Sequence, residues 1–139
     1  EIAEQVLNTV ENKLLNKYGL KTLSSDEDGY VDVYEGSAYR RDSSYHQGIT
    51  WPWLLGLYYD ALKNTMIIEK NRTKRQELEE KITKLVYTTK ETFKAEMFER
   101  SSIGTISEIY DSTEPYEERG AFAQAWSVAE IFRIVLNKR

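Results

Sequence analysis

The chain has 139 residues, of which 40% are hydrophobic and 30% are charged, a composition typical of one folded domain rather than of a disordered segment. Its net charge of −4 argues against the basic surface that nucleic-acid binding requires, so we expect no nucleic-acid partner. The absence of Cys excludes disulfide bonds and thiolate metal sites, and with a single His we expect no metal and no other cofactor.

No run of apolar residues approaches the roughly 20 that a membrane-spanning helix needs, so we expect no membrane partner. No signal peptide precedes the first helical pattern, and a cytoplasmic location is expected. The chain opens on Glu1 directly within that pattern. We therefore expect residues 1–139 to form a single partial domain that begins within a longer chain.

Hydrophobic periodicity predicts four helices. The first spans about Ile2–Tyr18, where apolar residues recur at intervals of three and four, and Gly19 follows as its C-cap. The second starts at a proline and covers about Pro52–Leu62. The third extends over about Arg72–Phe98 and the fourth over about Ala121–Asn137.

The first and third of these helices are amphipathic, whereas the second and fourth are apolar on most sides. A toroid of alternating outer and inner helices would produce this order, because inner helices pack against neighbours on several sides. No segment alternates with a period of two over any length. The predicted fold class is therefore all-α, with no sheet of more than two strands and at most a short strand pair near Tyr30–Tyr34.

Two connections between the helices are long and polar, namely Leu20–Trp51 and Arg100–Gly120. Loops of this length in a compact domain are usually functional or disordered. Each precedes an apolar helix, so in an alternating toroid both open on the same face, where we look for chemistry. The two apolar helices also have more apolar surface than four helices can cover. We expect the chain to self-associate through these inner-helix faces.

The two connections and the start of the last helix combine carboxylates, one His, an amide and several aromatic side chains. Aromatic rings stack on the apolar face of a pyranose while polar groups fix its hydroxyls, so this combination is typical of a sugar site. The motifs GxxxxGK[ST], GxGxxG, HExxH and GxSxG are absent, which removes the common nucleotide-binding, zinc-protease and serine-hydrolase classes. The candidates are Asp42, Tyr45, His46, Trp51, Trp53, Glu108, Asp111, Gln124 and Trp126.

Each candidate also has a purely structural interpretation. Trp51, Trp53 and Trp126 stand at helix starts, where aromatic residues are usually part of the core. His46 is the single histidine, and a hydrogen-bonded structural role is the default for such a residue. Glu108 is one of several carboxylates in its connection, most of which are expected to be solvated. Composition and spacing leave both interpretations open.

Two stretches resemble one known family. Residues 41–54 (RDSSYHQGITWPWL) resemble the "RD..YH.G..WPWL" segment of amylo-α-1,6-glucosidase domains in glycogen debranching enzymes. Residues 106–111 (ISEIYD) and 120–127 (GAFAQAWS) resemble the closing "SEI.D … G…QAWS" segment of the same domains. The order and spacing also match, and the resemblance covers most of the chain outside the third helix.

The resemblance implies a six-hairpin (α/α)6 toroid, of which the four helices would form the last third. It implies hydrolysis of α-1,6-linked glucose at branch stubs of glycogen or another branched α-glucan, with inversion. Inversion uses an acid and a base carboxylate roughly 6.5–9.5 Å apart, with a water molecule between substrate and base. The resemblance assigns the base to Glu108 and the acid to an Asp of an earlier hairpin that has no counterpart in this chain. The positions that match sugar-site residues are Asp42, Tyr45, His46, Trp51, Trp53, Asp111, Gln124 and Trp126.

Two hypotheses follow from the sequence. In the first, the chain is part of a debranching glucosidase and is inactive alone because it lacks the general acid. In the second, it is a stand-alone helical module that binds carbohydrate or a protein partner without catalysis.

Overall fold

The computed structural model describes residues 1–100 and 104–136. More than half of these residues are helical, which confirms the predicted helical class. Each of the four expected helices has a counterpart, and a small sheet and one short helix are added. In chain order the elements are α1 (Ile2–Thr9), the π-helical turn η1 (Val10–Leu14), β1 (Leu20–Lys21), α2 (Ala38–Ser44), β2 (Thr50–Trp51), α3 (Leu54–Ile68), α4 (Arg72–Glu99), β3 (Ile109–Tyr110), β4 (Glu118–Arg119) and α5 (Ala125–Leu136).

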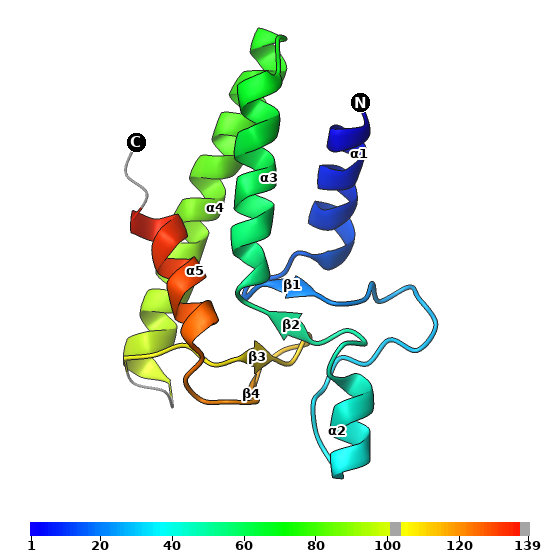
Figure 1. Ribbon diagram of the computed structural model, residues 1–139. Coiled ribbons are helices and arrows are strands. Elements are labelled where there is room, and N and C mark those ends of the chain that lie inside the picture. The colour runs from blue at the N-terminus through cyan, green and yellow to red at the C-terminus, as the bar shows by residue number, and fades with distance from the viewer. Residues whose placement is uncertain (101–103, 137–139) are drawn as a thin grey trace.

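The four long helices run side by side, and the sheet lies beyond one end of α1 and α3 (Figure 1). Helix α3 is central, since it packs against α1, α4 and α5. Helices α3 and α5 both have their N-termini near the sheet (Figure 1). The main core draws buried side chains from the four long helices, from β3 and from the connecting segments. Its buried members include Leu7, Tyr18, Leu55, Tyr58, Tyr59, Leu62, Leu85, Phe93, Tyr110, Ile131 and Ile134.

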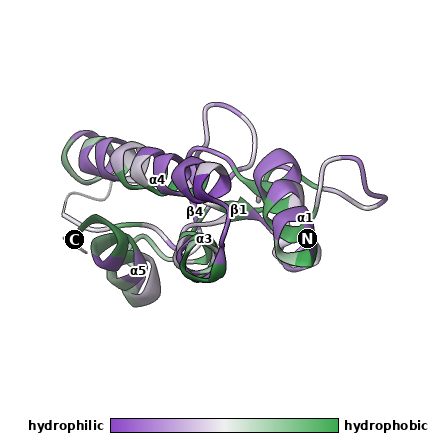
Figure 2. Cartoon of the chain, turned by 90° about the horizontal axis from the view of Figure 1, so that it is seen from above, coloured by the Kyte–Doolittle hydropathy of each residue, from purple (hydrophilic) through white to green (hydrophobic). Residues whose placement is uncertain are grey.

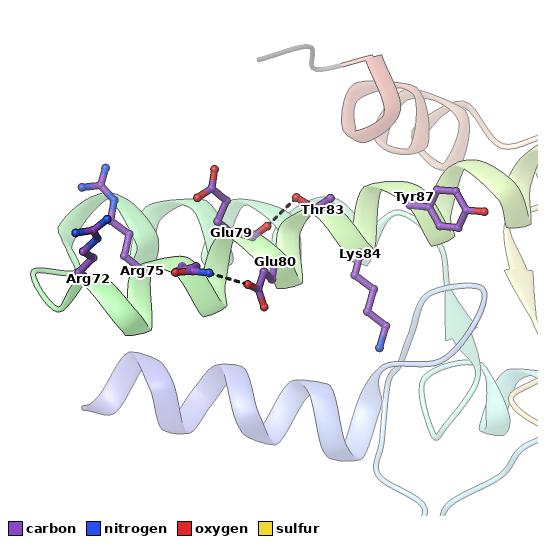
Figure 3. Close-up of a pocket in the computed structure, with 8 residues that line it drawn as sticks. Arg72, Arg75, Glu79, Glu80, Thr83, Lys84 and Tyr87 are labelled. Carbon is purple, nitrogen blue, oxygen red and sulfur yellow. Dashed lines mark hydrogen bonds between the residues drawn. The ribbon is translucent and has the colours of Figure 1, made fainter.

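Helix α4 has the apolar stripe that its periodicity predicts. Leu78, Leu85 and Phe93 on this stripe are buried against the other helices. Its opposite side carries a shallow depression that is lined by α4 side chains alone and is mostly charged or polar, including Arg72, Glu79, Glu80, Lys84 and Tyr87 (Figure 3). This depression is a solvated outer face of the helix and contains none of the candidate residues. No helix within the described residues combines the length and hydrophobicity needed to cross a membrane.

The first helix ends earlier than its periodicity predicts. Helical structure stops at Leu14, and Leu15 is extended with φ −69° and ψ 130°. The Asn16 side chain explains this ending, because its Oδ1 accepts hydrogen bonds from the backbone N–H groups of Tyr18 (3.0 Å) and Gly19 (3.2 Å). An Asn side chain that satisfies backbone donors in this way competes with continuation of a helix.

The second and fourth helices start later than predicted. Helix α3 begins at Leu54 rather than Pro52, because Thr50 and Trp51 extend into strand β2. Helix α5 begins at Ala125 rather than Ala121, since the backbone of Gln124 still donates to Ile106 O at 3.0 Å. The predicted end of this helix at residue 137 lies outside the described residues.

The prediction of at most two strands is wrong. Four two-residue strands form an antiparallel sheet in the order β1-β2-β3-β4. The segment Tyr30–Tyr34, where a strand pair was expected, contains no strand. A two-residue strand shows no alternation that periodicity could detect, and β2 pairs with β3 across a long stretch of sequence at Thr50 and Tyr110. Helix α2 was also not predicted; the Ser37 side chain caps it by accepting from Arg40 N at 3.3 Å.

The sheet joins the two long connections. Strands β1 and β2 lie at the ends of the first connection, and β3 and β4 lie within the second. Because β2 pairs with β3, both connections meet at the end of the helical layer where α3 and α5 begin (Figure 1). The structure therefore places them on one face, as the alternation of helices predicted.

Helices α3 and α5 leave apolar side chains exposed. Seen from above, hydrophobic residues gather on α3 and α5, whereas α4 is mostly hydrophilic (Figure 2). This distribution agrees with inner and outer helices, although closure into a toroid stays a prediction. The exposed apolar residues of α3 and α5 are Leu57, Ile67, Ile68, Trp126, Phe132 and Leu136.

We expect residues 1–139, expressed alone, to self-associate through these faces of α3 and α5. Leu57→Glu and Phe132→Glu should each weaken association roughly tenfold or more, since burying a Leu or Phe side chain is worth about 1.5–3 kcal/mol. Sedimentation velocity over a range of concentrations measures this change.

Tyr87→Glu is the matched control, because Tyr87 is 65% exposed on the outer side of α4. The prediction fails if the unmodified chain stays monomeric over that range, or if Tyr87→Glu weakens association as much as Leu57→Glu.

Candidate active site

Glu108 occupies the junction between the two connections. It lies immediately before β3 and is half-buried. Its backbone N–H donates to Ala121 O and its Oε2 accepts from Ala121 N, both at 2.9 Å. Its Oε1 accepts a hydrogen bond from the hydroxyl of Tyr45, which belongs to the first connection. One carboxylate is thus held by donors from two segments that are far apart in sequence.

Gly120 makes the close approach of Ala121 possible. It has φ +68°, in the left-handed region that a side chain disfavours. A Cβ atom at this position would lie 2.4 Å from Glu108 Oε2. The glycine is therefore needed both for the backbone turn and for the space that the carboxylate occupies.

Tyr45 stands at the C-terminal end of α2 and points to Glu108. Burial first, and then the neighbouring Glu108 carboxylate, raise the pKa of Tyr45 well above its usual range. The phenol therefore stays protonated at physiological pH and acts as a donor. Its position is fixed by Trp51, whose ring centroid lies 4.6 Å away and whose Nε1 donates to Tyr45 O at 3.2 Å.

Six rings gather beside this carboxylate, and we call them the aromatic patch: Tyr34, Tyr45, His46, Trp51, Trp53 and Trp126. His46 stacks on Trp51 with centroids 5.3 Å apart and an interplanar angle of 11°. Trp126 stacks on Trp53 at 5.5 Å and meets Trp51 edge to face at 6.0 Å. Trp51 is only 4% exposed, whereas Trp126 is 45% exposed and His46 is also exposed. Trp51 therefore supports the patch, and His46 and Trp126 offer ring surface to a ligand.

Asp111 is buried and both its oxygens are bonded within the protein. Its Oδ1 accepts from Tyr34 N at 2.8 Å, and its Oδ2 accepts from Arg119 Nε and Nη2 at 3.0 and 2.8 Å. Its backbone N–H donates to Glu117 O at 2.9 Å. Asp111 thus fastens the β3–β4 hairpin to the first connection. Contact with substrate, which its motif position implies, stays a prediction.

Two further candidates lie at the margins. Gln124 precedes α5, and its Oε1 accepts from Ala125 N at 3.0 Å, at the start of the helix that carries Trp126. Asp42 is exposed on α2, three residues before Tyr45. The structure thus brings together Glu108, Tyr45 and the aromatic residues, while Asp42 and Asp111 have other surroundings.

Sequence reasoning missed Tyr34 and Arg119. Tyr34 contributes a ring 5.6 Å from Tyr45 and the backbone donor to Asp111. Arg119 supplies the guanidinium for Asp111 across the hairpin. The pairing of β3 with β4 places Arg119 opposite Ile109, two residues before Asp111 and on the same side of the hairpin. Knowledge of this pairing would have indicated Arg119, but strands this short leave no periodic signal.

The candidate site combines one carboxylate, which can accept a proton, with aromatic rings, which can stack on a ligand. Within residues 1–100 and 104–136, no group of three or more His, Cys, Asp or Glu side chains is placed to hold a metal ion. A carboxylate that keeps some exposure can accept a proton from water or from a sugar hydroxyl.

A family model described as amylo-alpha-1,6-glucosidase matches residues 1–133. The chain belongs to this family. The match includes both motif segments, all nine candidate residues and the whole β3–β4 hairpin. Membership of the amylo-alpha-1,6-glucosidase family identifies a glycoside-hydrolase type of domain related to glycogen debranching enzyme.

Gly120→Ala should displace Glu108. As a test of the base role that the family resemblance implies for Glu108, we expect a loss of about 10- to 100-fold in the turnover of the full-length protein, because misplacing a catalytic group by about 1 Å has effects of this size. Stability should fall by roughly 1–3 kcal/mol from the left-handed backbone. Turnover and thermal unfolding measure the two effects.

Gly29→Ala is the matched control. Gly29 has a similar φ of +85°, and a Cβ there meets nothing within 4 Å. This variant should lose comparable stability and keep turnover; equal loss of turnover in both variants would contradict the role given to Gly120.

Asp111→Asn should destabilise the hairpin by roughly 1.5–3 kcal/mol, because it removes the charge that strengthens the hydrogen bonds from the half-buried Arg119 to the buried Asp111. Denaturant unfolding measures this change. Glu117→Gln, an exposed neighbour on the same hairpin, should leave stability within about 0.5 kcal/mol of the parent. Unchanged stability of Asp111→Asn would show that the contacts to Arg119 and Tyr34 do not hold the hairpin.

Proposed function

We propose that this chain supplies the base side of an active site that hydrolyses α-1,6-glucosidic branch stubs of glycogen or a related branched α-glucan, with inversion. The observation that carries the proposal is the position of Glu108. It is a half-buried carboxylate held by Tyr45 and Ala121 beside the aromatic patch, in a chain of the amylo-alpha-1,6-glucosidase family.

The hydrogen bonds of Glu108 suit a general base. An ionised carboxylate offers about four lone-pair positions, and Tyr45 and Ala121 N use one on each oxygen. The remaining positions can accept a proton from an attacking water molecule. The two donors also fix the side-chain rotamer, so the base is oriented before substrate binds.

The aromatic patch suits recognition of a pyranose. A sugar ring has one face of C–H groups, which stacks on an aromatic ring, and an edge of hydroxyls, which binds polar groups. His46 and Trp126 are the members with exposed ring surface, and Gln124 lies beside Trp126 in sequence. We place the terminal glucose against these residues, with Tyr45, Trp51 and Trp53 behind them.

The general acid must come from elsewhere in the domain. Inversion requires a second carboxyl group roughly 6.5–9.5 Å from the base, to protonate the departing oxygen. The family pattern assigns this group to an Asp of an earlier helical hairpin, and we propose that it faces Glu108 across the sugar. Residues 1–139 alone should then bind glucan weakly and hydrolyse none.

The exposed aromatic patch also supports a second candidate, a helical module that binds carbohydrate without catalysis. The two differ in what Glu108 does. A binding module would use the carboxylate to hold a sugar hydroxyl, so its loss would weaken binding. A hydrolase would use it as a base, so its loss would slow turnover and leave binding nearly intact.

Glu108→Gln in the full-length protein tests this difference. We expect kcat to fall by roughly 10²–10⁴-fold with KM little changed, because the amide keeps the size of the side chain, can accept from Ala121 N and donate to the Tyr45 hydroxyl, but cannot accept a proton. Azide should partly rescue Glu108→Ala, because it attacks without losing a proton. Release of glucose from an α-1,6-branched dextrin, with its anomeric form followed by NMR, measures rate and inversion together.

Glu117→Gln is the control, an exposed carboxylate of the same hairpin. Near-normal turnover of Glu108→Gln would remove Glu108 from the role of base. Loss of glucan binding without loss of kcat would favour the binding module.

A further inference from the structure

A second carboxyl group of the molecule is more deeply buried than Glu108. Glu96, one turn before the end of α4, is 0% exposed. The Tyr110 hydroxyl donates to Glu96 Oε1 at 3.0 Å. Arg100 Nε lies 3.5 Å from Glu96 Oε2 and 3.1 Å from Glu118 Oε1. Glu96 is therefore surrounded by groups from β3, β4 and the end of its own helix.

Glu96 and Glu118 form a pair of carboxyl groups that face the same guanidinium nitrogen, Arg100 Nε. Burial first, and then interaction with the Glu118 carboxyl group, raise the pKa of Glu96 to about 7, although Tyr110 and Arg100 act in the opposite direction. With one proton present, the single guanidinium of Arg100 balances the remaining negative charge.

The same cluster ties together segments that are distant in sequence. Arg100 Nη1 donates to the Tyr18 hydroxyl at 2.9 Å, and its Nη2 donates to Tyr116 O at 3.3 Å. Tyr18 stacks on Tyr110 with ring centroids 4.5 Å apart. The charged and titratable groups that face Glu96 are thus Tyr110, Arg100 and Glu118, with Tyr18 behind them.

This cluster is linked by strand pairing and hydrogen bonds to the residues on either side of the candidate base. Glu118 pairs with Tyr110 across β3 and β4. The Tyr110 hydroxyl that donates to Glu96 also accepts from Ser107 N at 3.4 Å. Ser107 and Tyr110 stand on either side of Glu108 in sequence, so the backbone that carries Glu108 is fastened to α4 through Glu96.

We propose that the Glu96–Glu118 pair, together with Arg100, is a positioning element for Glu108. While Glu96 is protonated, the pair holds the β3–β4 hairpin on α4, and when Glu96 loses its proton the hairpin loosens. When Glu96 ionises, its buried carboxylate and the half-buried carboxylate of Glu118 face one guanidinium and repel each other. The role of Glu108 in this inference rests on the proposed function; the hold on the hairpin does not.

The proton linkage has a definite sign. The pKa of Glu96 in the folded protein is about 7, above its ordinary value of 4.5. Between these values the folded state binds more protons than the unfolded state, so the free energy of unfolding falls as pH rises. This loss of unfolding free energy is absent well below pH 4.5 and complete well above pH 7. Stability and hairpin order should therefore decline from about pH 5 to pH 8.

Glu96→Gln in the full-length protein tests the proposal. The amide mimics the protonated acid, because it can accept from Tyr110 and donate to Glu118. We expect its unfolding temperature to vary less with pH than that of the parent protein over the window given above. We also expect the alkaline limb of the kcat profile to move to higher pH, with KM unchanged.

Hydrogen exchange reports on the hairpin without any assay of hydrolysis. At pH 8 the ionised form of a group with pKa about 7 outnumbers the protonated form about tenfold. The amides of Glu108 and Ala121 should then exchange about tenfold or more faster in the parent protein than in Glu96→Gln. At pH 5 the two proteins should exchange at the same rate.

Glu99→Gln is the matched control, since it removes one exposed carboxylate from the same turn of α4 and should follow the parent at every pH. The proposal is overturned if Glu96→Gln keeps the parent's pH dependence, or if it lowers stability equally at all pH values. If the exchange difference appears while Glu108→Gln keeps normal turnover, the positioning element stands and the proposed base does not.

Discussion

The pairing of β2 with β3 at Thr50 and Tyr110 is the contact on which the rest of the site depends. It is a short pairing, but its polar groups are buried and bonded. The Thr50 hydroxyl is fully buried, 2.6 Å from Ser112 Oγ, and it accepts from Asn16 Nδ2 at 2.6 Å. Breaking the pairing would leave several buried polar groups unsatisfied, at roughly 1–3 kcal/mol for each. The two connections therefore separate only at considerable cost, despite the small size of the sheet.

The geometry around Glu108 follows from this contact. Because β2 and β3 are antiparallel, Trp51 packs near Ile109, the residue after Glu108, and Tyr45, which packs on Trp51, reaches the carboxylate. Trp51 in β2 and Trp126 in α5 meet for the same reason, because α5 begins just after the hairpin of β3 and β4. The helices contribute the layer against which this joint packs. The site is thus formed by two loops on a helical support rather than by side chains of the helices themselves.

Hydrophobic periodicity predicted the four long helices and the contrast between α4 and the apolar α3 and α5, because burial of one face or of several faces leaves a repeated signal. The motif resemblance selected Glu108 and aromatic residues that the structure brings together, and their roles stay a prediction. Periodicity could not show the sheet, whose strands are two residues long and whose β2–β3 pairing joins distant positions. It also could not show that Asn16 ends the first helix or that Arg119 binds Asp111, because each depends on one side chain rather than on a pattern.

Three carboxyl groups near the hairpin have three environments, and these environments separate their functions. Asp111 accepts hydrogen bonds from Tyr34 on one oxygen and from Arg119 on the other, so its carboxylate holds the hairpin in place. Glu96 is fully buried beside Tyr110 and Arg100 and its pKa is raised, so it is sensitive to pH but inaccessible to substrate. Glu108 alone among the three is half-buried and accepts a single bond on each oxygen from Tyr45 and Ala121. A base must meet water and must be oriented before it does so, and of these three groups Glu108 satisfies both conditions.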